Sequence, residues 1–171
     1  AHIIHHTETS DQIVSLAGGM DVDNDGYDDV VYGSNLWDVS GAGNSGGFAL
    51  LRGRATPDGL LGGDKISPIC SPTRTYRSGR ADDQLGWSIA MLGDLNGDGC
   101  AEYAVGARQS DSGASNQGHV RVIMSKKGSG ETCPVSGAEL LVFAPMAANA
   151  RAGTVAGCLL YTSDAADEVV R

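Results

Sequence analysis

Two acidic stretches of the chain place oxygen-bearing side chains at the spacing of a cation-binding loop. They occupy residues 21–29 and 94–102, and both follow the pattern D-x-[DN]-x-D-G-x-x-[DE]. Side-chain oxygens at positions 1, 3 and 5 can converge on one hard cation, and the carbonyl of position 7 can add another ligand. The glycine at position 6 permits the sharp turn that this convergence needs. Both stretches are therefore candidate calcium-binding loops, each closed by the carboxylate at position 9.

The main rival interpretation is an EF-hand, which needs a glutamate at position 12 and a helix on each side. Position 12 is Tyr32 in the first stretch and Val105 in the second. Each stretch is followed by a short β-rich run that ends in glycine, at Gly33 and Gly106. We therefore place the loops between strands. A simpler alternative is a turn made of Asp, Asn and Gly without a metal, but two copies with the same flanks favour the cation loop.

The sequence around the loop also occurs twice, with Asp21 and Asp94 lying 73 residues apart. Each copy continues with a strand, a hairpin rich in Gly, Ser and Asn, and a further strand over residues 47–51 or 118–123. The looser segments 52–81 and 125–152 would hold the last strand of each unit, with residues 139–143 as a candidate. No convincing helical period longer than two turns is present.

Repeated units of about four short strands are typical of propeller blades. We expect an all-β fold, a partial β-propeller of two antiparallel blades with three or four strands each, plus a stub. Both cation loops should lie on the same side. Two units do not close a ring of 4 to 8 blades, so the sequence predicts a fragment of a longer chain. The predicted segments are a leading stretch 1–9, repeats at 10–81 and 82–152, the start of a third repeat at 153–158, and a tail at 159–171.

The tail breaks the repeat where a third cation loop is expected. The run from Leu159 to Glu168 is acidic and contains no glycine. It resembles the translated product of a common sequencing adapter, and we interpret it as a non-native tail. The alternative is a genuine acidic tail.

Composition narrows the function classes further. The chain has 171 residues and a net charge of −9, which argues against nucleic acids and anionic membranes as partners. No apolar run of about 18 residues is present, so no membrane insertion is expected. The four cysteines include no C-x-x-C pair, which disfavours a zinc site and leaves a disulfide possible without requiring one. At position 7 only the carbonyl of Cys100 is needed, so the loop assigns no role to its thiol.

The repeated units resemble FG-GAP repeats, the blades of integrin alpha-subunit β-propellers and of their bacterial and extracellular relatives. Residues 86–90 (GWSIA) stand at the "FG" segment and residues 104–108 (AVGAR) at the "GAP" segment. The first unit has residues 31–34 (VYGS) at the "GAP" position and lacks the "FG" glycine. The resemblance covers roughly residues 10–157.

The resemblance implies Ca²⁺ bound in both loops, on the lower face of a propeller that serves as a platform for protein ligands. By position, the implied ligands of the first loop are Asp21, Asp23, Asp25, the Tyr27 carbonyl and Asp29. Those of the second loop are Asp94, Asn96, Asp98, the Cys100 carbonyl and Glu102. The glutamate at position 9 departs from the family's aspartate and lengthens one ligand arm.

We therefore expect a calcium-binding protein of the extracellular space or cell surface, involved in adhesion or protein–protein interaction and without enzymatic activity. A protein ligand or extracellular matrix is the expected partner. The alternative is a propeller appended to a hydrolase, such as a glycosyl-phosphatidylinositol phospholipase D-like enzyme, whose catalytic domain lies outside this chain. A dockerin-type calcium module is disfavoured because strands flank the loops.

Overall fold

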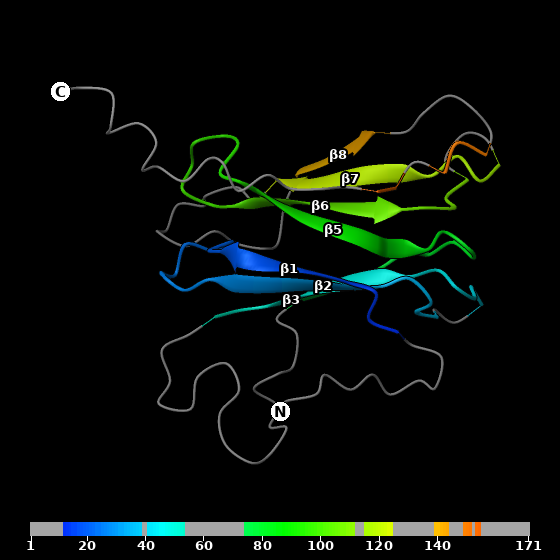
Figure 1. Ribbon diagram of the computed structural model, residues 1–171, viewed down its shortest axis with the longest axis horizontal. Helices are drawn as coiled ribbons and strands as arrows, with labels where there is room; N and C mark the ends of the chain where they lie inside the picture. The colour runs from blue at the N-terminus through cyan, green and yellow to red at the C-terminus, as the bar shows by residue number, and fades with distance from the viewer. Residues whose placement is uncertain are drawn as a thin grey trace, which may run out of the picture.

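Eight strands form two antiparallel sheets in the computed structural model, which describes residues 12–38, 41–53, 74–111, 115–124, 139–143, 149–151 and 153–154. The strand orders are β1-β2-β3-β4 and β5-β6-β7-β8, and Figure 1 labels each of these strands except β4. The first sheet comprises β1 (Ser15–Met20), β2 (Asp29–Ser34), β3 (Gly47–Leu51) and β4 (Arg74–Arg77). The second comprises β5 (Leu85–Gly93), β6 (Glu102–Ala107), β7 (His119–Met124) and β8 (Glu139–Phe143).

The predicted all-β fold with two antiparallel units is confirmed within these residues. They contain no helix, and hence none that is long and apolar enough to cross a membrane. The candidate last strand at residues 139–143 is β8, and β4 lies inside the segment 52–81 that was expected to hold its counterpart.

Each sheet is a meander in which every strand pairs with the next along the chain. Val30 and Tyr103 are equivalent, because each directly follows position 9 of its loop. Val30 pairs with Leu51 in the first sheet and Tyr103 pairs with Ile123 in the second, so β2 and β3 have the same register as β6 and β7. The irregular step in the pairing at the end of β1, between Gly18 and Met20, recurs at the end of β5, between Met91 and Gly93. The loops that follow these steps are the two acidic stretches. The repeated sequence therefore folds into a repeated structure.

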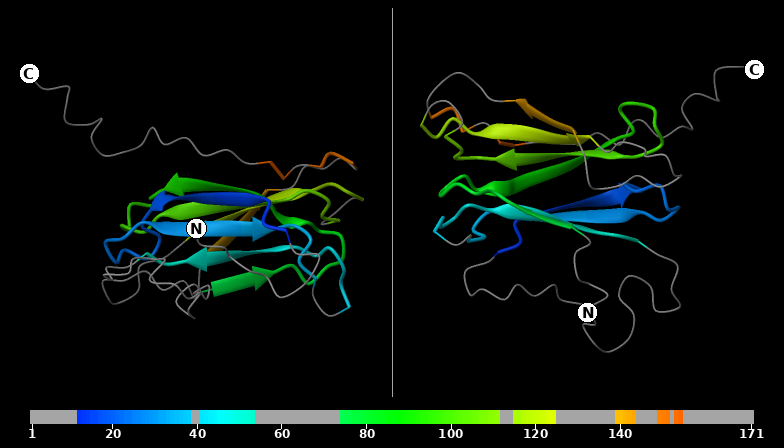
Figure 2. Two further views of the ribbon diagram at one scale, coloured as in Figure 1. Left: turned by 60° about the horizontal axis from the view of Figure 1, so that its bottom comes forward. Right: turned by 180° about the vertical axis from the view of Figure 1, so that it is seen from behind.

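The two sheets pack face to face through one apolar core. The first sheet contributes Val31, Phe48 and Leu50, and the second contributes, among others, Ile89 and Tyr103. Figure 2 shows from two further sides that β5 lies against β1 and β2. Tyr32, Ala49 and Leu51, on the opposite face of the first sheet, form a second buried cluster. Since apolar residues line both faces, this sheet has the character of an inner layer in a stack.

Glycines permit a very close approach where β5 begins. A methyl group added at Gly33 would overlap the Gly86 carbonyl oxygen, and one added at Gly86 would overlap that of Gly47. Gly86 also has a φ of 84°, a conformation that other residues seldom adopt. The Ser15 hydroxyl donates a hydrogen bond of 2.7 Å to the Gly86 carbonyl and fixes the junction.

The same junction recurs on the second sheet. A methyl group at Gly106 would overlap the Gly153 carbonyl oxygen, to which the Ser88 hydroxyl donates a hydrogen bond. Gly153 thus takes the structural place of Gly86. The leading stretch, the third repeat beyond Thr154 and the tail at 159–171 lie outside the described residues.

Candidate calcium centre

The first acidic loop joins β1 to β2 and is curled by its own aspartates. Asp21 Oδ1 accepts a hydrogen bond from the Asp25 amide at 3.1 Å, and its Oδ2 accepts one from the Gly26 amide at 2.7 Å. Asp25 Oδ1 accepts a third bond, from the Tyr27 amide at 3.0 Å. Gly26 has a φ of 89°, so the glycine at position 6 supplies the turn that the pattern predicts.

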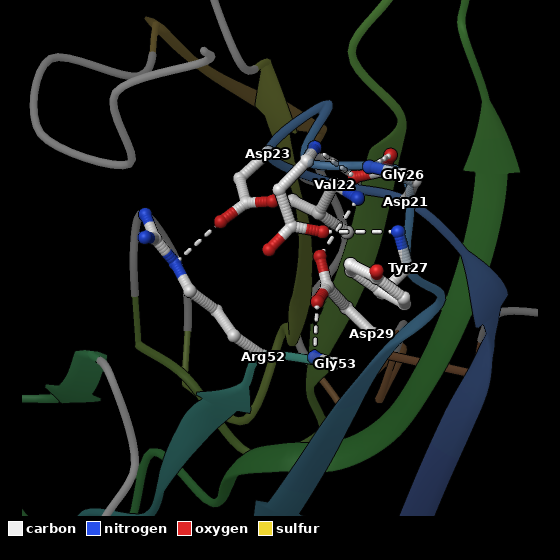
Figure 3. A network of polar contacts seen from close by, with 9 residues as sticks. Asp21, Val22, Asp23, Gly26, Tyr27, Asp29, Arg52 and Gly53 are labelled. Carbon is white, nitrogen blue, oxygen red and sulfur yellow. Dashed lines mark hydrogen bonds and ion pairs between the residues drawn. The ribbon is translucent and has the colours of Figure 1, made fainter. Parts of the chain in front are cut away.

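Asp29, at position 9, opens β2 and is fully buried beneath the loop. Its Oδ2 accepts a hydrogen bond from the Val22 amide at 2.8 Å, and its Oδ1 accepts one from the Gly53 amide at 2.8 Å (Figure 3). Burial raises the pKa of Asp29 to about 6, and the two hydrogen bonds oppose that rise. The carboxylate is therefore held in place by the backbone at considerable electrostatic cost.

Three carboxylates of this loop converge. One oxygen each from Asp21, Asp23 and Asp29 lies within 4.8 Å of the others. Asp23 is 1% exposed; its Oδ2 lies 2.6 Å from Arg52 Nε, while its Oδ1 accepts no hydrogen bond from the described residues. Burial raises the pKa of Asp23, and Arg52 opposes this effect. A shared cation would relieve the cost of gathering these charges away from water.

The donor set of this loop fits Ca²⁺. It offers only oxygen atoms, which hard cations prefer, and the buried Asp23 Oδ1 is a ready ligand. The remaining first-loop candidates lie outside the group of three. Asp25 is exposed with its Oδ1 directed to the Tyr27 amide, and Tyr27 is exposed as well. The sequence pattern did not reveal Arg52 or Gly53, which reach the site from the end of β3.

The second loop, between β5 and β6, repeats the same backbone contacts. Asp94 Oδ1 accepts a hydrogen bond from the Asp98 amide at 3.1 Å, and its Oδ2 accepts one from the Gly99 amide at 2.7 Å. Asp98 Oδ1 accepts from the Cys100 amide at 2.9 Å. Glu102 Oε2 accepts from the amide at position 2 at 2.7 Å, as Asp29 does in the first loop. The longer glutamate arm therefore preserves this contact.

The second loop nevertheless differs from the first in its acidic groups. Across the described ranges, the only group of three or more His, Cys, Asp or Glu side chains close enough to share a metal is the one in the first loop. Asn96 replaces the carboxylate of Asp23 at position 3, and its Oδ1 accepts a hydrogen bond from the Asp98 amide at 2.9 Å.

Cys100 is disulfide-bonded, so its side chain has a role that the loop pattern did not assign. The other three cysteines lie outside the described residues.

The two loops lie side by side at the same end of the sheets, as the repeat predicted (Figure 1). The Ala101 amide donates a hydrogen bond of 3.2 Å to the Asp21 carbonyl. Val22 and Ala101 also belong to the shared apolar core. The loops are thus packed against each other through their own backbones.

Comparison with known proteins places the second unit in a family. The family model of the FG-GAP repeat matches residues 85–123, which span β5, the second loop, β6 and most of β7. A search of the curated proteins finds no match to the chain. The first sheet has the same strand order, the same register between its second and third strands, and an equivalent loop. Residues 85–123 of this chain are an FG-GAP repeat.

Proposed function

We propose that the chain is a calcium-binding part of a β-propeller and that each of its two acidic loops binds one Ca²⁺. The observation that carries this proposal is the convergence of the Asp21, Asp23 and Asp29 carboxylates under one loop. The matching hydrogen bonds of Asp94 and Glu102 support a second site of the same design. Ca²⁺ suits such a loop better than Mg²⁺, which demands tight octahedral geometry and retains its waters.

The packing of the sheets supports a propeller. Gly86 docks on the first sheet and Gly153 docks on the second in the same manner. A junction repeated in this way stacks one sheet on the next, which is how blades assemble around a ring. Apolar clusters on both faces of the first sheet agree with a blade that lies between two neighbours.

The proposed setting is the extracellular space or the cell surface, where the propeller would bind a protein ligand or matrix and perform no catalysis. The disulfide at Cys100 supports an oxidising compartment. Extracellular calcium modules bind with Kd of about 10⁻⁴ to 10⁻³ M. At ten times Kd each site would add about 1.4 kcal/mol to the stability.

Isothermal titration with Ca²⁺ tests the two sites separately. Asp25→Ala should abolish binding at the first site and Asp98→Ala at the second, because both residues occupy position 5 of their loops. Their side chains make the same contact, to the amide at position 7, so the two variants are matched. Asp28→Ala is the control, since Asp28 is exposed and stands at a position that supplies no ligand. Unchanged binding in the double variant Asp25→Ala/Asp98→Ala would show that position 5 supplies no ligand in either loop. No calcium binding by the folded wild-type protein would reduce both loops to ordinary turns.

A further inference from the structure

Arg52 lies against the first calcium loop although it comes from another strand. It directly follows β3, and its Nε lies 2.6 Å from Asp23 Oδ2. The Arg52 side chain is 39% exposed and that of Asp23 only 2%. Figure 3 shows the guanidinium reaching Asp23 from the side away from Asp21 and Asp29. The acidic group therefore has a positively charged neighbour that belongs to the protein itself.

The second unit carries no such cation at the corresponding place. Leu51 pairs with Val30 in the first sheet, as Ile123 pairs with Tyr103 in the second. The next residue along the strand is Arg52 in one unit and Met124 in the other. The arginine thus accompanies the loop that has aspartate at position 3, whereas the loop with Asn96 at that position has a methionine. The unit with the additional carboxylate, Asp23, is therefore also the unit with the additional cationic side chain, Arg52.

Arg52 can act on a bound cation in two opposite ways. Its contact to Oδ2 leaves Oδ1 of Asp23 available as a ligand, so it could hold the carboxylate in a useful orientation. Its positive charge also repels any cation in the loop, and the repulsion doubles for a divalent ion. The repulsion should dominate, because Asp23 is already confined by burial and gains little from further orientation.

We propose that Arg52 sets the calcium affinity of the first loop. It is the counter-ion of Asp23 in the metal-free protein, and it weakens the binding of a divalent cation. The proposal rests on the calcium site described above. A counter-ion within the protein would offset part of the repulsion among the four aspartates of this loop when no metal is bound.

The test is a calcium titration of Arg52→Met in an Asp98→Ala background, so that only the first site responds. Methionine is the residue that the second unit carries at this place. We expect Arg52→Met to bind Ca²⁺ about tenfold more tightly than the background protein, a difference of about 1.4 kcal/mol. Arg52→Lys, which keeps the charge, should stay within about threefold of the background. Unchanged or weaker binding in Arg52→Met would overturn the proposal.

A matched control separates a local effect from a change in overall charge. Arg77→Met removes the same charge from the end of β4. Arg77 pairs there with Gly47, at the end of β3 far from Arg52, and stacks on Trp37. Its calcium affinity should stay within about twofold of the background. An equal gain in Arg77→Met would overturn the proposal, because long-range charge would then explain the effect. If adding Ca²⁺ produces no heat of binding in the wild-type protein or in any variant, the calcium site itself is refuted.

The metal-free protein provides a readout that needs no calcium. In EDTA, Arg52→Met should have a lower Tm than the Asp98→Ala background, because the buried Asp23 loses its counter-ion. Saturating Ca²⁺ should remove most of this difference. An unchanged Tm in EDTA would contradict the role of Arg52 as counter-ion.

Discussion

Replacing Gly33 with alanine is expected to destabilise the protein by about 3 kcal/mol or more, a large share of the stability of a domain this size. The added methyl group would overlap the Gly86 carbonyl oxygen and the Ser15 hydroxyl, which are hydrogen-bonded to each other. Because the nearest atom belongs to the backbone, β5 would have to move away from the first sheet. The apolar core between the sheets would then open. Urea denaturation followed by circular dichroism measures the loss.

Gly79→Ala is the matched control for this substitution. A methyl group at Gly79 meets no atom within 4 Å, and Gly79 has no positive φ. Its free energy of unfolding should stay within about 0.5 kcal/mol of wild type. Equal stability of Gly33→Ala and Gly79→Ala would mean that the two sheets do not pack as described.

Asp29→Ala is expected to abolish calcium binding at the first site and to lower the stability of the calcium-loaded protein by about 3 kcal/mol. The Val22 and Gly53 amides would both lose their acceptor, and each buried unpaired donor costs about 1–3 kcal/mol. Removing a carboxyl whose pKa burial raises to about 6 offsets part of that loss. Loss of bound calcium accounts for about 1.4 kcal/mol at ten times Kd.

Thermal denaturation with and without Ca²⁺ separates these contributions. Asp29→Ala should melt below wild type in EDTA, and calcium should raise its Tm less than that of wild type. Asp28→Ala removes the neighbouring charge from an exposed position and should behave as wild type under both conditions. If calcium raises the Tm of Asp29→Ala and wild type equally, Asp29 is not a ligand.

The repeated pattern allowed much of the fold to be predicted. In both loops the glycine at position 6 donates its amide hydrogen bond to the aspartate at position 1. The residues that define the pattern therefore also shape the turn. The flanking strands follow from short β-rich runs, and even β8 was recognisable from residues 139–143. Signals of this kind depend on neighbours within about ten residues, so a single sequence reveals them.

The features that the sequence did not reveal depend on contacts between distant residues. Arg52 meets Asp23 only because β3 pairs with β2, and Gly53 reaches Asp29 by the same pairing. The convergence of Asp21, Asp23 and Asp29 without Asp25 is a matter of side-chain orientation, which spacing alone does not fix. The loop pattern likewise gives no indication that Cys100 is disulfide-bonded.

Equilibrium dialysis of the wild-type protein against radioactive Ca²⁺ tests the central claim most directly. We expect two bound ions per chain at saturation, with half-saturation at about 10⁻⁴ to 10⁻³ M, the range of extracellular modules. A tenfold excess of Mg²⁺ over Ca²⁺ should displace little of the bound calcium. No bound calcium at several millimolar in a sample that circular dichroism shows to be folded would contradict the account.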